Sequence, residues 1–175
     1  GVVIPVSGSG AVGLSYAQVN YGRMDVRTVS NPEGTGETFN SYDISLGLSY
    51  AQPLTSSFYF GGTAKYVRQD IRDMSAQTVA FDIGFILETN YFNGMQLAAS
   101  IQNFGGQMKM DGVNSVVFVD IDPNNSGSNP NIPASVDMGS WSLPLSFRFG
   151  TSIPVVKRDG FQLLALADAH QSNDN

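Results

Sequence analysis

The sequence predicts an all-β protein, an antiparallel up-and-down transmembrane β-barrel of which this chain carries about eight strands. Three observations predict this fold class. Apolar and polar residues alternate over long segments, short and long connections alternate between those segments, and charged residues make up only 14% of the chain, against roughly 25% in an ordinary soluble domain. Successive side chains of a strand point to opposite faces, so the alternation indicates a sheet whose two faces meet different surroundings.

The strand pattern occurs in segments that no amphipathic helix interrupts. These segments are residues 1–6, 10–28, 41–52, 57–72, 77–89, 94–109, 141–155 and 160–171. The short connections contain the Gly, Pro, Asn and Asp that tight hairpins require. Between them lie longer connections at 29–40 and 111–140 and a brief one at 73–76. Outer-membrane barrels have short periplasmic turns at one end and longer external loops at the other.

Irregularities are expected in two of the strands. In the second strand the apolar positions change face between Tyr16 and Val19, which predicts a bulge near Ala17 or Gln18. Proline removes a donor from the hydrogen-bond ladder. Pro144 therefore predicts a bulge or a local interruption of the seventh strand.

The two faces of the predicted sheet differ in charge. On the central strand, one face carries Val79, Phe81, Ile83, Phe85 and Leu87. Charged residues in the central parts of the strands fall on the opposite, polar face: Asp43, Lys65, Asp82, Glu88 and Arg148. A lipid-facing Lys or Arg at the bilayer midplane costs about 2–4 kcal/mol, so the apolar face is expected to meet lipid.

Aromatic residues gather beside the short turns, in the manner of the aromatic girdle of a membrane barrel. They are Tyr50, Phe58, Phe60, Tyr91, Phe92 and Phe161. Alternation alone also fits a soluble β-sandwich or a lipocalin-like barrel whose apolar face lies inside. Low charge, long strands and connections sorted by end favour the membrane barrel.

Composition limits the function classes. The net charge is −6 and no basic stripe is present, which argues against nucleic-acid binding. The chain has no cysteine, so thiol catalysis, cysteine-ligated metal sites and disulfides are excluded. The chain begins and ends at strands, so residues 1–175 are expected to be an internal part of a single outer-membrane β-barrel domain.

Several co-linear segments carry a family resemblance. They are NPEGTGETFNSYDISLGLSYA (31–51), YAQPLTSSFYFGGTAKYVRQDIRDMSAQTVAFDIG (50–84), LAASIQNFGGQMKMDG (97–112), DIDPNNSGSNPNIPA (120–134) and SWSLPLSFRFG (140–150). The chain resembles the PorV/PorQ family of outer-membrane proteins, which are similar in architecture to the FadL long-chain fatty-acid transporters. The resemblance implies a barrel of about 14 strands in the intact protein, a Bacteroidetes-type outer membrane, and association with the type IX secretion system.

The inward charges are the first set of candidate site residues. The predicted lumen-facing polar network consists of Asp43, Lys65, Asp82, Glu88, Arg148 and Asp168. Unpaired buried charge is costly, so these residues either pair with one another and hold the barrel shut or form the polar lining of a substrate path. His170 stands near Asp168, but proximity in sequence does not make a triad, and the chain is expected to be neither an enzyme nor a cofactor protein.

The second set lies in the long connection at 119–133. Asp120, Asp122 and Asn124 have the opening spacing of an EF-hand, but Asn131 stands where that loop requires Glu, and prolines intrude. No metal is therefore expected. These four residues are expected instead to form part of an external partner-binding loop.

The resemblance and the residues together predict a component of type IX protein secretion, located in the bacterial outer membrane, that binds or shuttles secreted cargo proteins. Expected partners are outer-membrane lipid and secreted cargo or other secretion-system proteins, with no nucleic acid. The alternative is a FadL-like channel for hydrophobic small molecules, and a third possibility is a purely structural barrel. The inward residues are mostly small and polar, which disfavours an apolar conduit.

Overall fold

A computed structural model describes residues 1–6, 8, 10–121, 124 and 131–173, and it is all-β, as predicted. Eight principal strands form one antiparallel sheet. They are β1 (Val2–Val6), β2 (Gly10–Asp25), β3 (Thr38–Pro53), β4 (Phe58–Ile71), β5 (Met74–Glu88), β6 (Gln96–Gly105), β12 (Ser146–Arg158) and β13 (Phe161–Ser172). Most of them contain the alternating apolar and polar residues from which they were predicted, whereas β1 (VVIPV) is apolar throughout.

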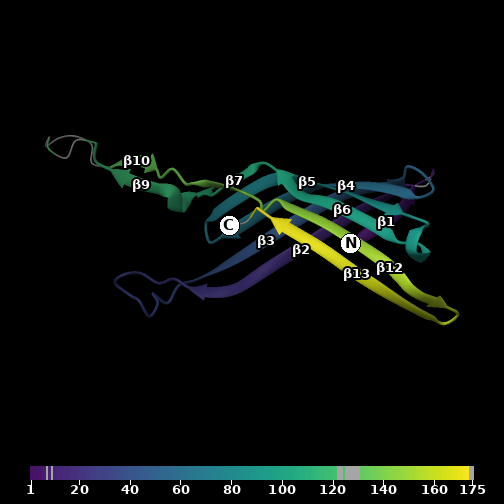
Figure 1. Ribbon diagram of the computed structural model, residues 1–175. Helices are drawn as coiled ribbons and strands as arrows, with labels where there is room; N and C mark the ends of the chain where they lie inside the picture. The colour runs from purple at the N-terminus through teal and green to yellow at the C-terminus, as the bar shows by residue number, and fades with distance from the viewer. Residues whose placement is uncertain (7, 9, 122–123, 125–130, 174–175) are drawn as a thin grey trace.

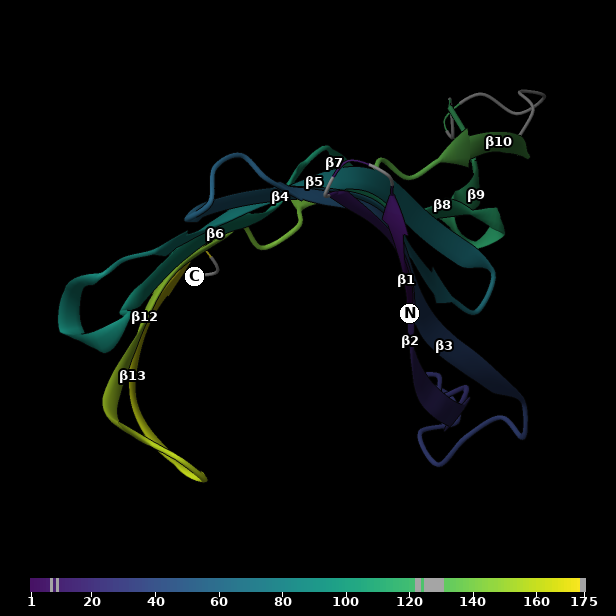
Figure 2. The same ribbon diagram turned by 90° about the vertical axis from the view of Figure 1, so that its right-hand side faces the viewer.

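The strands follow one another across the sheet in the order β1-β2-β3-β4-β5-β6-β12-β13, and every neighbouring pair is antiparallel. Figures 1 and 2 show the sheet as a strongly curved arch. Within the described residues the arch does not close, because β1 and β13 form its two edges. The structure is therefore an open, curved antiparallel sheet.

The connections are sorted by end, as the sequence indicated. Short turns join β1 to β2, β3 to β4, β5 to β6 and β12 to β13 at one end. The β5–β6 turn contains the 3-10 turn η1 (Tyr91–Asn93). The opposite end carries the β2–β3 connection, the tight β4–β5 turn, and the long excursion between β6 and β12 (Figure 1). This second end is called the long-loop end below.

The excursion between β6 and β12 is more ordered than a loop, which corrects the prediction for residues 111–140. It contains β7 (Gln107–Lys109), β8 (Asp111–Gly112), the 3-10 turn η2 (Val113–Ser115), β9 (Val116–Val119), β10 (Ile132–Ser135) and β11 (Ser140–Ser142). Strand β7 pairs with β11 and β9 pairs with β10. Strand β9 consists of valine and phenylalanine, which favour extended backbone, and this explains why it forms a hairpin with β10.

Two predicted strands are interrupted, one at a glycine and the other at a proline. The strand expected at 94–109 ends at Gly105, where a Cβ would lie 2.3 Å from the Val79 carbonyl oxygen, so only glycine fits. The strand expected at 141–155 is interrupted between β11 and β12, at Pro144. The predicted interruption at Pro144 is confirmed.

The predicted bulge in β2 occurs, but not at Ala17 or Gln18, which pair regularly with β3. The register shifts between Asn20 and Arg23 instead. Gly22 adopts a left-handed conformation there (φ 80°), and its N–H donates to Asn20 Oδ1 at 2.8 Å. A glycine that accepts positive φ therefore locates the bulge more reliably than the change of apolar face did.

Candidate functional site

The two faces of the sheet differ in exposure as well as in composition. On β5 the apolar side chains Val79, Phe81 and Ile83 are each 49% exposed, whereas Ala80 and Thr78, on the opposite face, are 0% and 9% exposed. The face that carries Val79 is called the outer face, and the face that carries Ala80 is called the inner face. Large apolar side chains thus cover the outer face, and no layer formed by the described residues lies against them.

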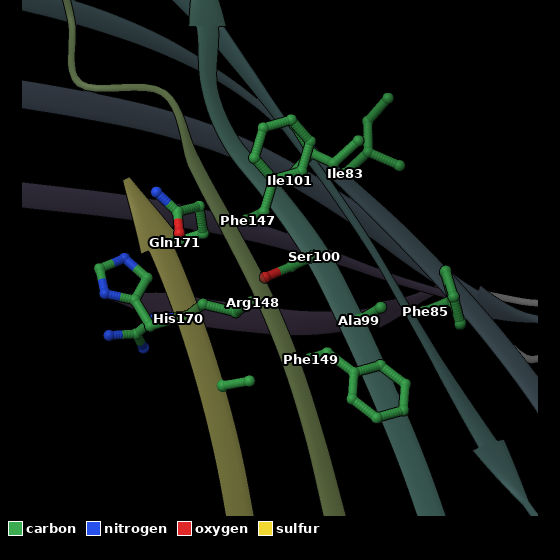
Figure 3. A pocket seen from close by; sticks show the side chains of 11 residues that line it. Ile83, Phe85, Ala99, Ser100, Ile101, Phe147, Arg148, Phe149, His170 and Gln171 are labelled. Atoms are coloured by element: carbon green, nitrogen blue, oxygen red, sulfur yellow. The ribbon is translucent and has the colours of Figure 1, made fainter. Parts of the chain in front are cut away.

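The outer face contains a groove of about 560 Å³. In Figure 3 the rings of Phe147 and Phe149 stand on β12, and the small side chain of Ala99 lies on β6 between Phe149 and Phe85. The groove arises because β6 presents alanine where its neighbours β5 and β12 present aromatic rings. An exposed groove of this composition suits an apolar surrounding rather than water.

The aromatic residues predicted beside the short turns do lie at that end of the sheet. Tyr91 and Phe92 in the β5–β6 turn are 74% and 70% exposed. Phe58, at the start of β4, places its ring centroid 5.8 Å from that of Phe85. The short-turn end therefore carries a band of exposed rings, and the contact between Phe58 and Phe85 within it is tilted.

The inner face holds a polar cluster at its centre. Lys65 on β4 and Asp82 on β5 are diagonal neighbours on this face, and Lys65 Nζ lies 2.7 Å from Asp82 Oδ1. Their side chains are only 18% and 25% exposed. Asn103 on β6 joins them, since its backbone N–H donates to Asp82 Oδ1 at 2.8 Å and its Oδ1 accepts from Lys65 Nζ at 2.5 Å.

Asn103 reaches this position because β6 bulges. The register between β5 and β6 shifts around Asp82, and Asn103 has φ 63°, a left-handed conformation that asparagine tolerates better than most residues. Its side-chain amide donates to the carbonyl oxygen of Pro144 at 2.7 Å. In Figure 2 the yellow-green connection that leads into β12 runs on the concave side of the arch, so the inner face is the concave face.

Two further predicted residues lie apart from this cluster. Asp43 on β3 accepts hydrogen bonds from the Tyr21 hydroxyl at 2.7 Å and from Gln69 Nε2 at 3.3 Å. Glu88 ends β5 at the short-turn end, is exposed, and accepts from Gln96 Nε2 at 3.0 Å. Each of the two carboxylates is thus held by neutral groups of its neighbouring strands.

A hollow of about 670 Å³ brings three predicted residues to one surface on the inner face. Asp82, Arg148 and Asp168 line it, over a floor of small residues that includes Gly84 and Gly150. Within the described residues, neither Arg148 nor Asp168 makes an ion pair. The hollow therefore presents a guanidinium and a carboxylate to whatever occupies the concave side, and both are suited to polar rather than apolar groups.

His170 takes a different partner from the one its sequence suggested. Its Nε2 lies 2.7 Å from the hydroxyl oxygen of the buried Ser146, its diagonal neighbour on β12. In the described part of the chain, no carboxylate is hydrogen-bonded to this imidazole. The contact thus lacks the third group that orients the base of a catalytic triad.

The residues of the predicted partner-binding loop flank the β9–β10 hairpin. Asp120 follows β9 and Asn131 precedes β10. Asn124 lies in a turn between the two strands, and Asp122 lies outside the described residues. The hairpin itself, which the sequence did not predict, carries exposed Val and Phe side chains on β9.

The base of the excursion is joined by a surface ion pair. Lys109 Nζ on β7 lies 2.5 Å from Asp137 Oδ1, which follows β10, and both side chains are largely exposed. The hydrogen bond from Lys109, reinforced by its positive charge, lowers the pKa of the Asp137 carboxyl. A lowered pKa in the folded chain means that this pair stabilises above the carboxyl's unfolded pKa and stops doing so as pH falls through the folded value.

We therefore expect Asp137 to titrate below the usual range of aspartate, and its pKa to rise in Lys109→Gln. The measurement is the ¹³C chemical shift of the aspartate carboxyl followed as a function of pH in both proteins. Because the pair is exposed, overall stability should change little between the two. An unchanged titration in Lys109→Gln would mean that Lys109 does not set this pKa.

The structure offers few features of other functional classes. No group of three or more His, Asp or Glu side chains is arranged to hold a metal ion in the described ranges. No helix among the described residues is long and apolar enough to cross a membrane. Comparison with known protein families, curated proteins and solved structures finds no match to this chain.

Asn103 is the main residue of the inner cluster that sequence reasoning missed. A usable signal was present, because asparagine followed by Phe-Gly-Gly at a strand end is a sequence that accepts positive φ. Gln69 and Tyr21, which hold Asp43, carried no comparable signal. Their role depends on the register of three strands, which only the folded sheet reveals.

Proposed function

We propose that the chain is part of the wall of an outer-membrane β-barrel that acts as a protein-binding component of type IX secretion. One observation carries the proposal: the large apolar side chains lie exposed on the outer, convex face, while small and charged side chains gather on the inner, concave face. A soluble barrel or sandwich has the opposite arrangement, with its large apolar side chains enclosed.

A closed barrel requires the two edges of the arch, β1 and β13, to pair with further strands. The curvature of the sheet and the band of aromatic rings at the short-turn end both suit such a barrel in a bilayer. In this arrangement the short turns face the periplasm and the β9–β10 hairpin projects outside the cell.

The hairpin supports the binding part of the proposal. Val113, Phe118 and Ile121 in and around it are 73%, 69% and 72% exposed. It extends away from the sheet at the long-loop end (Figure 1), where membrane lipid would not cover these side chains. Exposed apolar patches rimmed by polar residues typically mark protein interaction sites.

Deletion of residues 115–135 tests the binding role. We expect the shortened barrel to fold, as shown by heat-modifiable migration, but to lose retention of a purified secreted protein that bears the C-terminal signal domain. The matched control shortens the 26–37 connection at the same end, which is closed by its own hydrogen bonds, including Val26 N–H to Glu37 O at 2.9 Å. Undiminished retention after the 115–135 deletion would exclude the hairpin as the binding surface.

A channel for hydrophobic small molecules is the second candidate, and one observation favours it. Leu164 and Leu166 on β13 share the inner face with Asp168 and are 45% and 74% exposed. They make the short-turn side of the concave surface more apolar than its centre. The same deletion separates the two functions, because a channel would keep its transport when the hairpin is removed.

A further inference from the structure

The β9–β10 hairpin is a short two-stranded sheet with apolar side chains on both faces. Val117 and Val119 lie on one face, and Val116 and Phe118 lie on the other. Their exposed fractions range from 37% for Val119 to 69% for Phe118. A hairpin of two strands alone is only marginally stable in water, and a third strand would stabilise it.

One hydrogen bond at the base of the β9–β10 ladder shows which of its residue pairs are hydrogen-bonded and which are not. The Val136 N–H donates to the carbonyl oxygen of Ser115 at 2.7 Å, which makes these two residues a hydrogen-bonded pair. Hydrogen-bonded and non-hydrogen-bonded pairs alternate in an antiparallel ladder. The backbone N–H and C=O groups of Val116 and Phe118 therefore point away from β10, towards the outer edge of β9.

The two outer edges of the hairpin are not equivalent. Pro133 is paired with Phe118, so its missing N–H falls on the outer edge of β10 and leaves that edge without a donor. The outer edge of β9 keeps the donor of Phe118, whereas the Val116 N–H donates to the Val113 carbonyl oxygen at the end of η2. Among the described residues, no strand other than β10 pairs with β9. An edge strand with neither proline nor charge is a template for another strand.

We propose that the outer edge of β9 receives an extended segment of a partner protein as an added β-strand. This proposal rests on the proposed function and specifies how the partner is held: the N–H and C=O groups of Phe118 and the C=O group of Val116 bond the incoming strand. The segment between residues 107 and 140 contains four aspartates, and Lys109 is its only cationic residue. The partner strand therefore combines β-branched residues with lysine or arginine.

The test uses the full chain in lipid vesicles and the synthetic peptide KVTVTVTVK as the probe. We expect Phe118→Pro to weaken peptide binding by at least about tenfold, because it removes an outward donor and obstructs the edge while leaving the β9–β10 ladder intact. Phe118→Leu keeps the donor and the apolar contact, and should bind within about threefold of the unchanged chain. The acidic peptide EVTVTVTVE should bind at least about tenfold more weakly.

Hydrogen exchange at the Val117 and Val119 amides verifies that the hairpin persists in Phe118→Pro. If the hairpin is lost, KVTVTVTVK N-methylated at its valines and threonines takes the place of the variant, since it cannot donate to the carbonyl oxygens of Val116 and Phe118. Binding as strong as that of the unmethylated peptide would overturn strand addition. Peptide binding unchanged in a proline variant with protected amides would overturn strand addition. Strand addition would likewise be overturned if retention of the secreted protein were lost on deletion of residues 115–135 but unchanged by the proline substitution. That outcome would leave the proposed function standing. Retention that does not need these residues would overturn both.

Discussion

Phe85→Arg is expected to destabilise the folded chain in a bilayer by about 2 kcal/mol or more, whereas Ile86→Arg should cost less than about 1 kcal/mol. The two residues are adjacent on β5 and are 42% and 45% exposed. They lie at the same depth but on opposite faces, so they differ in the medium that each meets. Arginine on the outer face must leave water for lipid, whereas arginine on the inner face extends over the hollow that Asp82, Arg148 and Asp168 line.

The measurement is urea unfolding in lipid vesicles, followed by the loss of heat-modifiable migration. Nitroxide labels at the same two positions supply a direct check, because a label at position 85 should contact lipid and a label at position 86 should not. Equal costs for the two arginine variants would indicate that both faces meet water. That outcome would remove the membrane part of the proposed function.

The order and direction of the principal strands could be predicted because the alternation of residue types within a strand reflects the surroundings of its two faces. Alternation around Ile83 on β5, or around Leu48 on β3, is a local property that the neighbouring strands do not alter. Connections rich in Gly, Pro, Asn and Asp then dictated which ends meet. Consecutive pairing of the strands followed because antiparallel neighbours need only a short turn.

The interruptions were harder to predict because they depend on contacts between strands. Gly105 ends β6 where the chain approaches the Val79 carbonyl, and no local pattern distinguishes it from the other glycines of strand segments. The β9–β10 hairpin was missed for a related reason. Its strands are four residues each, and neither Val116–Val119 nor Ile132–Ser135 alternates apolar and polar residues.

Some of the charge pairs on the inner face could be predicted from the sequence, and others could not. Lys65 and Asp82 have opposite charges at alternating positions, and they do pair. Arg148 also faces the concave side, but its opposite neighbours are Ser100 and His170 rather than a carboxylate. Pairing of charges across a sheet requires register, and register is set by bulges such as that at Asn103.

Asp82→Ala is expected to lower the free energy of unfolding by about 2–3 kcal/mol, because it leaves the Asn103 N–H without an acceptor and Lys65 without its counter-charge. Lys65 would keep a mostly buried ammonium with only Asn103 to accept from it, and the Asn103 backbone N–H would lose its bond inside the bulge. The connection at Pro144, held by the Asn103 amide, would loosen with it. Urea unfolding, together with hydrogen exchange at Asn103, measures both effects.

Glu88→Ala is the matched control, because Glu88 is a carboxylate of the same strand and inner face but is exposed and, among the described residues, accepts only from Gln96. It should change stability by less than about 0.5 kcal/mol. The double substitution Lys65→Met with Asp82→Ala should recover part of the loss, since the unpaired ammonium is removed. If Asp82→Ala cost no more than Glu88→Ala, the cluster would not hold the three strands together. The bulge at Asn103 would then be maintained by the backbone of β5 and β6 alone, and Pro144 would need another anchor.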